Sequence, residues 1–355
     1  MSTSELIPLV RVRKFTKAIA FVVGIFLFLL FSCPTSVAAD KEQFIIKIAT
    51  LAPEGSPWMN TFHTVNEEIE RKTGGKVKLR AYPGGVLGED KDMLRKMRIG
   101  QIHGGGFTGM GLGLINGDIF VMEIPFLFRD YGEVDYVLGN MDGQLRKGFE
   151  QEGYVLLGWS EIGFVYFLSN VPITSLKDIR GARVWLWEGD PIASPALRKA
   201  GITPIPLGIP DVLMALQTNL IDVVYASPLA AIALQWFTKV KYMTDLPLIY
   251  SLGGVLVMKK VFDKIPLNLQ DIVKDVFQYH SSLLNARTRK DNDEAIRVMT
   301  KQGIKLVTPS SEQTEKFKQI SREAMGDLTN RAFSKDVLDQ VRFHLDRYRK
   351  AQKVK

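Results

Sequence analysis

The sequence contains little that metal, redox or disulfide chemistry could use. Its only cysteine among 355 residues is Cys33, so a chain exported without its first 39 residues would have no disulfide. The four histidines, His63, His103, His280 and His344, are widely separated and show neither H-x-x-x-H spacing nor a neighbouring pair of acids. No nucleophile–base pair of the kind that hydrolases use stands out either. We therefore expect no catalytic residue, no metal and no cofactor.

The excess of basic over acidic residues is also smaller in the rest of the chain than the totals for all 355 residues suggest. The chain has 46 Lys and Arg against 38 Asp and Glu, which gives a net charge of +8. Residues 1–39 hold four of the basic residues and one of the acidic ones, so the remainder carries +5. No cluster of Lys and Arg with interleaved aromatic side chains occurs, and there are no internal repeats. We expect no nucleic-acid partner.

Residues 1–39 have the pattern of a targeting segment. A basic stretch precedes an apolar run over Ala18–Phe31. As a helix, this run would be about 21 Å long, short of the roughly 30 Å hydrocarbon core of a bilayer. Small residues ending at Ala39 suit cleavage, so we predict a signal peptide over residues 1–39 and export to the periplasm. A lipoprotein signal, with acylation of Cys33 and a lipid-anchored protein, is the alternative.

Strand-like and helix-like segments alternate in the rest of the chain. The apolar run Phe44–Leu51 has the composition of a buried strand, and Ser56 followed by Pro57 is typical of a helix start. The alternation continues with a strand over 76–82, a helix over 89–99 and a strand over 101–106. This βαβαβ order predicts an α/β fold with a mostly parallel sheet covered by helices. A long amphipathic helix is expected over 266–302.

A glycine-rich turn follows the third of these strands. Gly104, Gly106 and Gly109 spell G-x-G-x-x-G, but no acidic residue follows at the distance that a dinucleotide site requires. We interpret the turn as a tight strand-to-helix connection whose backbone approaches a ligand. Phe107 and Thr108 would lie at its tip.

The segment Ser175–Pro191 is a second place where a strand leads through a turn into a helix. Its run Ala182–Trp187 has strand composition, and Arg183, Trp185 and Trp187 would share one face of that strand. Ligands of open α/β sheets bind beyond the carboxyl ends of such strands. The residues leave two interpretations open: a face that contacts a ligand, or a buried core face with Arg183 paired at its rim.

This segment also resembles a known family. The residues Asp178–Leu186, DIRGARVWL, resemble a signature of the solute receptors of tripartite ATP-independent periplasmic (TRAP) transporters, the DctP family. Further similar stretches in the family's order are Ala49–Trp58, Lys72–Val77, Tyr82–Gly88, Ile124–Arg129 and Asp211–Asp222. The resemblance covers nearly all of residues 44–310. It implies a type II periplasmic-binding-protein fold with two lobes, hinge strands and a long helix that spans the lobes.

The resemblance also implies how the chain is divided and what it does. Lobe 1 is expected over 40–164 plus 251–285 and lobe 2 over 165–250 plus 286–355, with hinge crossings near Val165 and Tyr250. The protein would be a monomeric receptor that closes around a small organic ligand and delivers it to membrane permease subunits. The residues leave a ligand-sensing receptor and a secreted enzyme on the same fold as alternatives.

The departures from the family pattern bear on the ligand. By the resemblance, the family arginine that clamps a ligand carboxylate falls on Trp185, a second family arginine falls on Val165, and a ligand-binding asparagine falls on Ser227. Neither Trp nor Val can replace the bidentate pairing of Arg with a carboxylate. We expect an apolar or aromatic ligand; a carboxylate bound by Arg183 is the alternative. The residues predicted to contact the ligand are Trp185, Arg183, Tyr166, Val165, Phe107, Thr108, Tyr225, Ser227, Trp187 and Trp58.

Overall fold

The computed structural model describes residues 43–353, so the predicted signal peptide, its cleavage point and Cys33 lie outside the described residues. The helices alternate with strands through most of the chain, as expected for an α/β protein. They are α2 (Pro57–Lys72), α3 (Asp90–Arg98), α4 (Gly109–Gly113), η1 (Gly117–Glu123), α5 (Tyr131–Gln151), α6 (Leu176–Arg180), α7 (Ala193–Lys199), α8 (Ile209–Gln217), α9 (Pro228–Ala233), η2 (Trp236–Lys239), α10 (Lys259–Phe262), α11 (Leu267–Lys301), α12 (Ser311–Leu328) and α13 (Lys335–Lys353).

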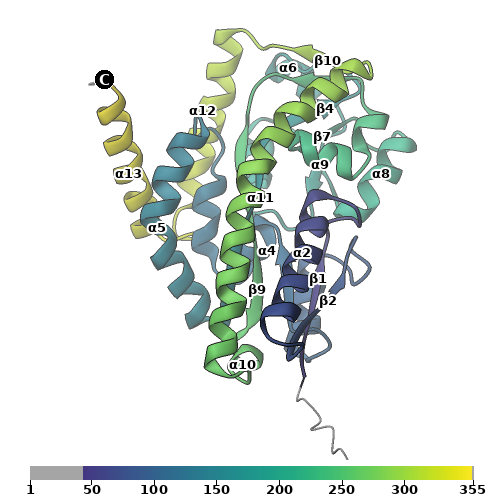
Figure 1. Ribbon diagram of the computed structural model, residues 1–355. Helices are drawn as coiled ribbons and strands as arrows, with labels where there is room; N and C mark the ends of the chain where they lie inside the picture. The colour runs from purple at the N-terminus through teal and green to yellow at the C-terminus, as the bar shows by residue number, and fades with distance from the viewer. Residues whose placement is uncertain (1–42, 354–355) are drawn as a thin grey trace, which may run out of the picture. The chain divides into compact units, whose positions relative to one another are not determined.

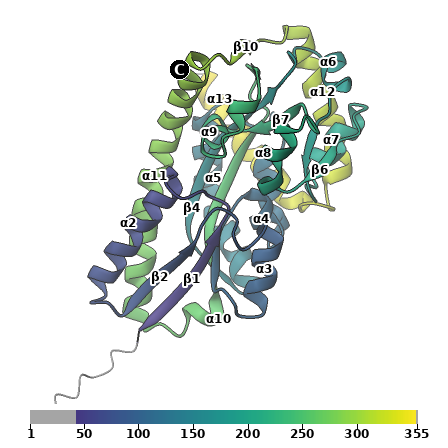
Figure 2. The ribbon, with the colours of Figure 1, turned by 90° about the vertical axis from the view of Figure 1, so that its right-hand side faces the viewer.

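The strands form one large mixed sheet and one small parallel pair. They are β1 (Phe44–Thr50), β2 (Val77–Tyr82), β3 (Gly104–Phe107), β4 (Tyr154–Ser169), β5 (Trp185–Trp187), β6 (Ile205–Leu207), β7 (Val223–Ala226), β8 (Tyr242–Thr244), β9 (Ile249–Met258) and β10 (Lys305–Val307). The large sheet has the order β10-β8-β4-β9-β3-β1-β2, with β7 also paired to β4, and β5 pairs with β6. Figure 2 shows β1 and β2 with α2 on one side and α3 on the other.

Strand β4 belongs to two groups of elements, which we call lobe 1 and lobe 2. Its first part pairs antiparallel with β9, from Tyr154 opposite Met258 to Val165 opposite Ile249. Its last residues pair with β7 and β8 instead. Lobe 1 therefore contains β1, β2 and β3 with α2 to α5, and lobe 2 contains β5 to β8 with α6 to α9. The predicted two-lobe α/β fold with hinge strands is confirmed.

The hinge strand β4 is long, covering the 16 residues from Tyr154 to Ser169. It runs unbroken because β9 pairs along the whole of its first part, with register irregularities between Leu156 and Gly158 and between Glu161 and Gly163. Gly163 has a φ of 99°, a left-handed conformation that side chains other than glycine rarely adopt. A Cβ at this position would also lie 2.6 Å from the Asn292 amide nitrogen.

Helix starts follow the local sequence signals. The Ser56 hydroxyl accepts a hydrogen bond from the Met59 N–H, and Pro57 occupies the first turn of α2. The long helix α11 spans the residues expected of it and contacts α2 in lobe 1 and α9 in lobe 2, as Figure 1 shows. Among residues 43–353, no helix combines the length and apolar character needed to cross a bilayer.

The last two helices pack against different lobes. α12 contacts α6 and α7 of lobe 2, whereas α13 contacts α5 of lobe 1 and adds apolar residues to the core around that helix. The residue bounds predicted for the lobes remain a prediction.

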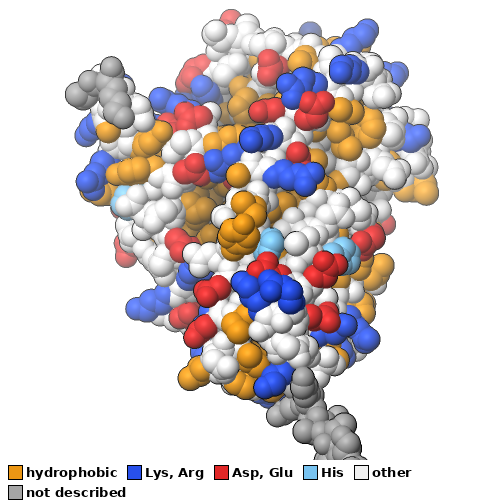
Figure 3. All heavy atoms as spheres, in the orientation of Figure 1, with side chains coloured by type: hydrophobic (Ala, Val, Ile, Leu, Met, Phe, Trp, Pro, Cys, Tyr) orange, Lys and Arg blue, Asp and Glu red, His pale blue; other side chains and the backbone are white. Residues whose placement is uncertain are grey.

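On the face shown in Figure 3, Lys and Arg side chains are interspersed with Asp and Glu.

Candidate functional site

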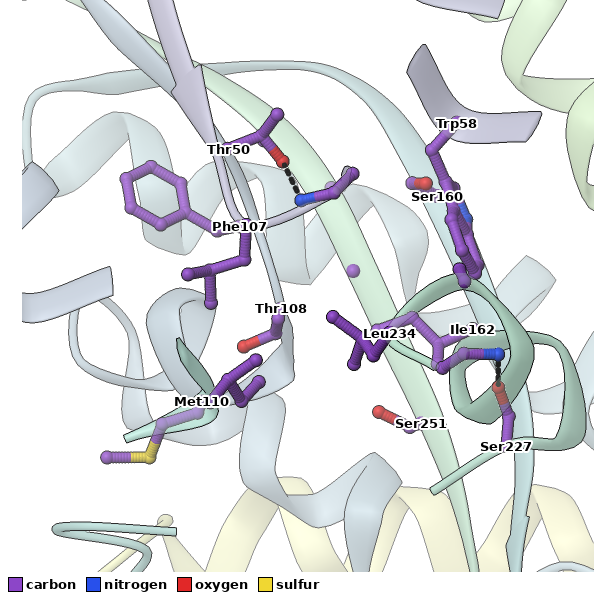
Figure 4. A pocket seen from close by; sticks show the side chains of 18 of the residues that line it. Thr50, Trp58, Phe107, Thr108, Met110, Ser160, Ile162, Ser227, Leu234 and Ser251 are labelled. Carbon is purple, nitrogen blue, oxygen red and sulfur yellow. Dashed lines mark hydrogen bonds between the residues drawn. The ribbon is translucent and has the colours of Figure 1, made fainter. Parts of the chain in front are cut away.

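A cavity of about 220 Å³ lies where the two lobes meet at the hinge. Its wall combines side chains from four parts of the chain, as Figure 4 shows. They are Thr50 and Trp58 from the β1–α2 region, Phe107, Thr108 and Met110 after β3, Ser160, Ile162 and Ser251 on the hinge strands, and Ser227 and Leu234 at the two ends of α9. Strand ends and helix starts converge here, which is the usual position of a ligand site in an α/β sheet.

An aromatic stack forms the lobe 2 side of this cavity. The rings of Trp185 and Tyr225 stack with centroids 4.7 Å apart, and the Trp236 ring meets Trp185 edge-on at 5.3 Å. The Trp185 indole N–H donates a 3.0 Å hydrogen bond to the Leu207 carbonyl oxygen. Trp185 is only 2% exposed, so the indole belongs to the core of lobe 2 as well as to the cavity wall.

The charged residues of the wall are both acidic. Glu123 is 9% exposed, and its Oε1 accepts hydrogen bonds from the Ser251 hydroxyl at 2.8 Å and the Leu252 N–H at 3.3 Å. Asp190 is partly buried, and its Oδ1 accepts from two backbone N–H groups that follow it in the chain. Among the described residues that line the cavity, none is Lys, Arg or His.

Burial changes the proton affinity of both acids. It raises the pKa of Glu123 to about 7, against the hydrogen bond from Ser251, and the nearby charge of Asp190 raises it further. Burial likewise raises the pKa of Asp190, although two backbone N–H groups and the Tyr225 hydroxyl donate to it. No Lys, Arg or His of the described lining compensates either acid, so burial disfavours the charged form of each.

A third acid lies behind the glycine-rich turn. The Thr108 hydroxyl donates a 2.6 Å hydrogen bond to Oδ2 of Asp90, while Oδ1 of this buried side chain has no partner among the described residues. Burial raises the pKa of Asp90 to about 7. Thr108 also accepts from the Gly111 N–H and begins α4, so this one side chain ties the acid to the cavity wall.

One carboxylate joins the lobes directly. Glu89 precedes α3 in lobe 1, and its Oε1 accepts a 2.6 Å hydrogen bond from the Ile209 N–H at the start of α8 in lobe 2. Its Oε2 accepts from the Trp187 indole N–H at 2.9 Å. Burial raises the pKa of Glu89, while these two bonds lower it. An exposed ion pair between Lys91 and Glu188, 2.8 Å apart, lies between the same elements.

Comparison with known proteins places the chain in a family. The DctP family, described as "Bacterial extracellular solute-binding protein, family 7", matches residues 48–332. The chain belongs to this family. A solute-binding protein of Verminephrobacter eiseniae is 26% identical over 312 residues, which cover 86% of this chain and 90% of the relative.

One further relative and one solved structure are informative for comparison. The C4-dicarboxylate-binding periplasmic protein DctP of Rhodobacter capsulatus is 23% identical over 77% of this chain and 82% of its own. The crystal structure of a sugar acid binding protein from Advenella mimigardefordensis in complex with galactonate has a TM-score of 0.81 at 19% identity, covering 86% of this chain and 99% of that one. The family consists of solute-binding receptors of TRAP transporters and not of enzymes.

The cavity of this solute-binding protein brings together eight of the ten predicted site residues. They are Trp58, Phe107, Thr108, Val165, Trp185, Trp187, Tyr225 and Ser227. Ser227 begins α9, where its hydroxyl accepts from the Ala230 N–H. Tyr166 is not part of the lining, although its neighbour Val165 is, because successive side chains of a strand point to opposite faces. Contact of these residues with a ligand remains a prediction.

Arg183 also lies outside the cavity lining. β5 begins only at Trp185, and the Arg183 guanidinium makes two hydrogen bonds, of 2.7 and 2.6 Å, with the Asp222 carboxylate. The side chain is 53% exposed. Hydrogen bonding to Arg183 lowers the pKa of Asp222, so the pair is ionised. This is the pairing expected of an arginine at the rim of a core face, and contact of Arg183 with a ligand remains a prediction.

The acids of the site were missed from the sequence. Glu123 could have been found, because a carboxylate inside the apolar run Ile119–Ile124 is unusual and requires a buried partner or a function. Asp190 gave no such signal, since Glu188–Pro191 has the composition of an ordinary turn.

Proposed function

We propose that this protein is the periplasmic receptor of a TRAP transporter for a small organic ligand with an apolar or aromatic body. It reaches the periplasm through cleavage of residues 1–39, which the intact mass of the mature protein would reveal. The lobes close on the ligand, and the closed receptor delivers it to membrane permease subunits.

The observation that carries this proposal is the composition of the cavity wall. Aromatic rings and aliphatic side chains dominate it, and none of the described lining residues is basic. The relative from Rhodobacter capsulatus is named for C4-dicarboxylates, and the Advenella protein binds galactonate, an acid. A carboxylate buried without a positive partner would cost several kcal/mol, so such ligands do not fit this wall. A ring does fit, because it can stack on the aromatic side.

The proposed closure of the two lobes on the ligand is supported by the origin of the wall residues in both lobes. Since the cavity is lined from both lobes, a ligand makes its full set of contacts only when the lobes are together. Its differential affinity for the closed state then shifts the population toward that state. Small-angle scattering should therefore show compaction when a ligand is added.

A pair of leucine variants tests the proposal. Wild-type protein should be stabilised against heat by 2-phenylethanol and not by succinate. Leu234→Ala removes apolar surface from the cavity and should weaken binding of the aromatic probe by about five- to tenfold, or roughly 1–1.4 kcal/mol. Leu220→Ala is the matched control, because Leu220 is 49% exposed and outside the lining. Tight binding of succinate, insensitive to Leu234→Ala, would show that the proposed ligand class is wrong.

A further inference from the structure

The ionisable side chains of the cavity wall are acidic, and the apolar character of the wall does not explain why they are there. Its described lining includes two carboxyl groups, Glu123 and Asp190, and no Lys, Arg or His. A receptor for an uncharged apolar ligand has no use for two acids in its cavity wall, because each would only add a desolvation cost. A receptor for an anion would be harmed by them.

Hydrogen bonds hold Glu123 in place through one carboxylate oxygen, and the other oxygen accepts none from the described residues. Oε1 accepts from both Ser251 and Leu252, which fixes the carboxyl group against β9. None of the described residues donates a hydrogen bond to Oε2, although the side chain is 9% exposed and lines the cavity. Gly109 permits this position, because a Cβ there would lie 2.0 Å from Oε1. The free oxygen of a fixed, buried acid can therefore accept a hydrogen bond from a ligand.

Asp190 is oriented in a comparable way from lobe 2. Its Oδ1 accepts the N–H groups of Ile192 and Ala193, and the Tyr225 hydroxyl lies 3.3 Å from Oδ2 as a donor. Tyr225 in turn accepts from the Trp187 N–H at 3.0 Å. The acid and the aromatic stack thus form one connected unit, and the acid cannot turn away to solvent without breaking these bonds.

From this arrangement we propose that the ligand carries a positively charged nitrogen, an ammonium or related organic cation, held by Glu123 and Asp190 beside the aromatic rings. The proposal rests on the proposed function of the same cavity and names the class of its ligand. A cation compensates both acids at once, whereas a hydroxyl group would fill only a hydrogen-bonding position. The faces of Trp and Tyr rings add attraction for a cation.

Three probes of similar size separate the ligand classes. They are 2-phenylethylamine, which is an ammonium ion at neutral pH, the neutral 2-phenylethanol and the anion 3-phenylpropanoate. Titration calorimetry at pH 7.5 should show that the amine binds at least tenfold more tightly than the alcohol and that the anion binds weakest. Glu123→Gln should remove at least tenfold of the amine's affinity and change that of the alcohol by less than about threefold.

The control variant is Glu188→Gln. Glu188 is exposed, lies two residues from Asp190 and is outside the cavity lining, so this change removes a nearby negative charge without altering the wall. It should reduce amine binding by less than about fivefold, because the ion pair with Lys91 that it breaks is exposed and screened by solvent. If Glu123→Gln does not fold, as judged by a cooperative thermal transition, Asp190→Asn provides the same test, because the amide oxygen can still accept from Ile192 and Ala193.

The outcomes distinguish this proposal from the one on which it rests. Equal binding of amine and alcohol would overturn the cation assignment and leave an apolar-ligand receptor intact. Tightest binding of the anion would overturn both. Binding of none of the three probes would also overturn the cation assignment, because two uncompensated acids in a cavity of this size should favour the amine. If Glu188→Gln lowered the affinity for the amine as much as Glu123→Gln does, the effect would come from the overall negative charge of this region and not from a contact in the cavity. That result would also overturn the cation assignment.

Discussion

Glu89 should control how readily the two lobes close. Its carboxylate lies in lobe 1 and accepts two hydrogen bonds from lobe 2, from Ile209 and Trp187. In an open state both bonds would be lost and the carboxylate would return to water. We chose Glu89→Ser as the perturbation, because serine can still cap the start of α3 but is too short to reach across to α8.

The expected magnitude follows from the two bonds. A hydrogen bond to a charged group contributes about 1.5–3 kcal/mol net, so two contribute at least about 3 kcal/mol to closure. We take the lower value, because burial raises the pKa of Glu89 and so offsets part of the gain. A loss of about 3 kcal/mol shifts the closing equilibrium about 150-fold toward the open state. For a receptor that is open when empty, the ligand dissociation constant rises by the same factor.

The assay measures the distance between the lobes by pulsed electron spin resonance. Val86 in lobe 1 and Met214 in lobe 2 are 70% and 62% exposed, and both can be replaced by cysteine for labelling. The only native cysteine, Cys33, lies in the predicted signal peptide. At a ligand concentration that closes the wild type, Glu89→Ser should show mostly the longer, open distance.

Lys91→Ala provides the matched control for Glu89→Ser. It removes the exposed interlobe pair with Glu188, which should contribute less than about 1 kcal/mol because solvent screens it. The reasoning fails if Glu89→Ser opens the protein no more than Lys91→Ala does. It also fails if Glu89→Ser lowers the thermal stability of the unliganded protein as much as it lowers ligand affinity.

Three further changes have definite expected outcomes. Arg183→Ala should leave ligand affinity within about twofold and the midpoint of urea denaturation almost unchanged, because the exposed guanidinium pairs with Asp222 outside the cavity and solvent screens the pair. Trp185→Ala should lower the free energy of unfolding by about 3–5 kcal/mol, since the indole is 2% exposed; a loss below about 1 kcal/mol would contradict its place in the core. The unliganded protein should lose stability as the pH rises from about 4 to 7, because the folded-state pKa of Asp90, about 7, lies above its ordinary value of 3.8 and the folded state holds more protons in that window. Asp90→Asn should reduce this slope in thermal unfolding scans, and an unchanged slope would count against the buried, protonated acid.

The sequence predicts those features whose cause lies within a few residues. Ser56 and Pro57 determine the start of α2 because the cap bond reaches only to Met59. The apolar stripe of α11 is likewise visible in the chain itself. The positions of Phe107 and Tyr225 at the cavity could be anticipated because both occur at strand ends.

The acids could not be placed in this way, because what matters about them arises between distant segments. Glu123 meets Ser251 across 128 residues, and Asp190 meets Tyr225 across 35. Glu89 reaches Ile209 across 120 residues. Nothing local to an acid tells whether such partners will surround it. The same holds for β4, whose continuity depends on pairing with β9 and not on its own composition.

The absence of an arginine at position 185 and the presence of Glu123 and Asp190 both disfavour an anionic ligand. By the resemblance, Trp185 occupies the position at which the family carries a carboxylate-clamping arginine. An arginine there would lie in a cavity wall that already holds two carboxyl groups, and it would pair with them instead of remaining free for a ligand. Restoring the arginine in this chain would therefore not by itself restore carboxylate binding. The charge of the whole wall sets the ligand class, and in the described residues that charge comes from Glu123 and Asp190.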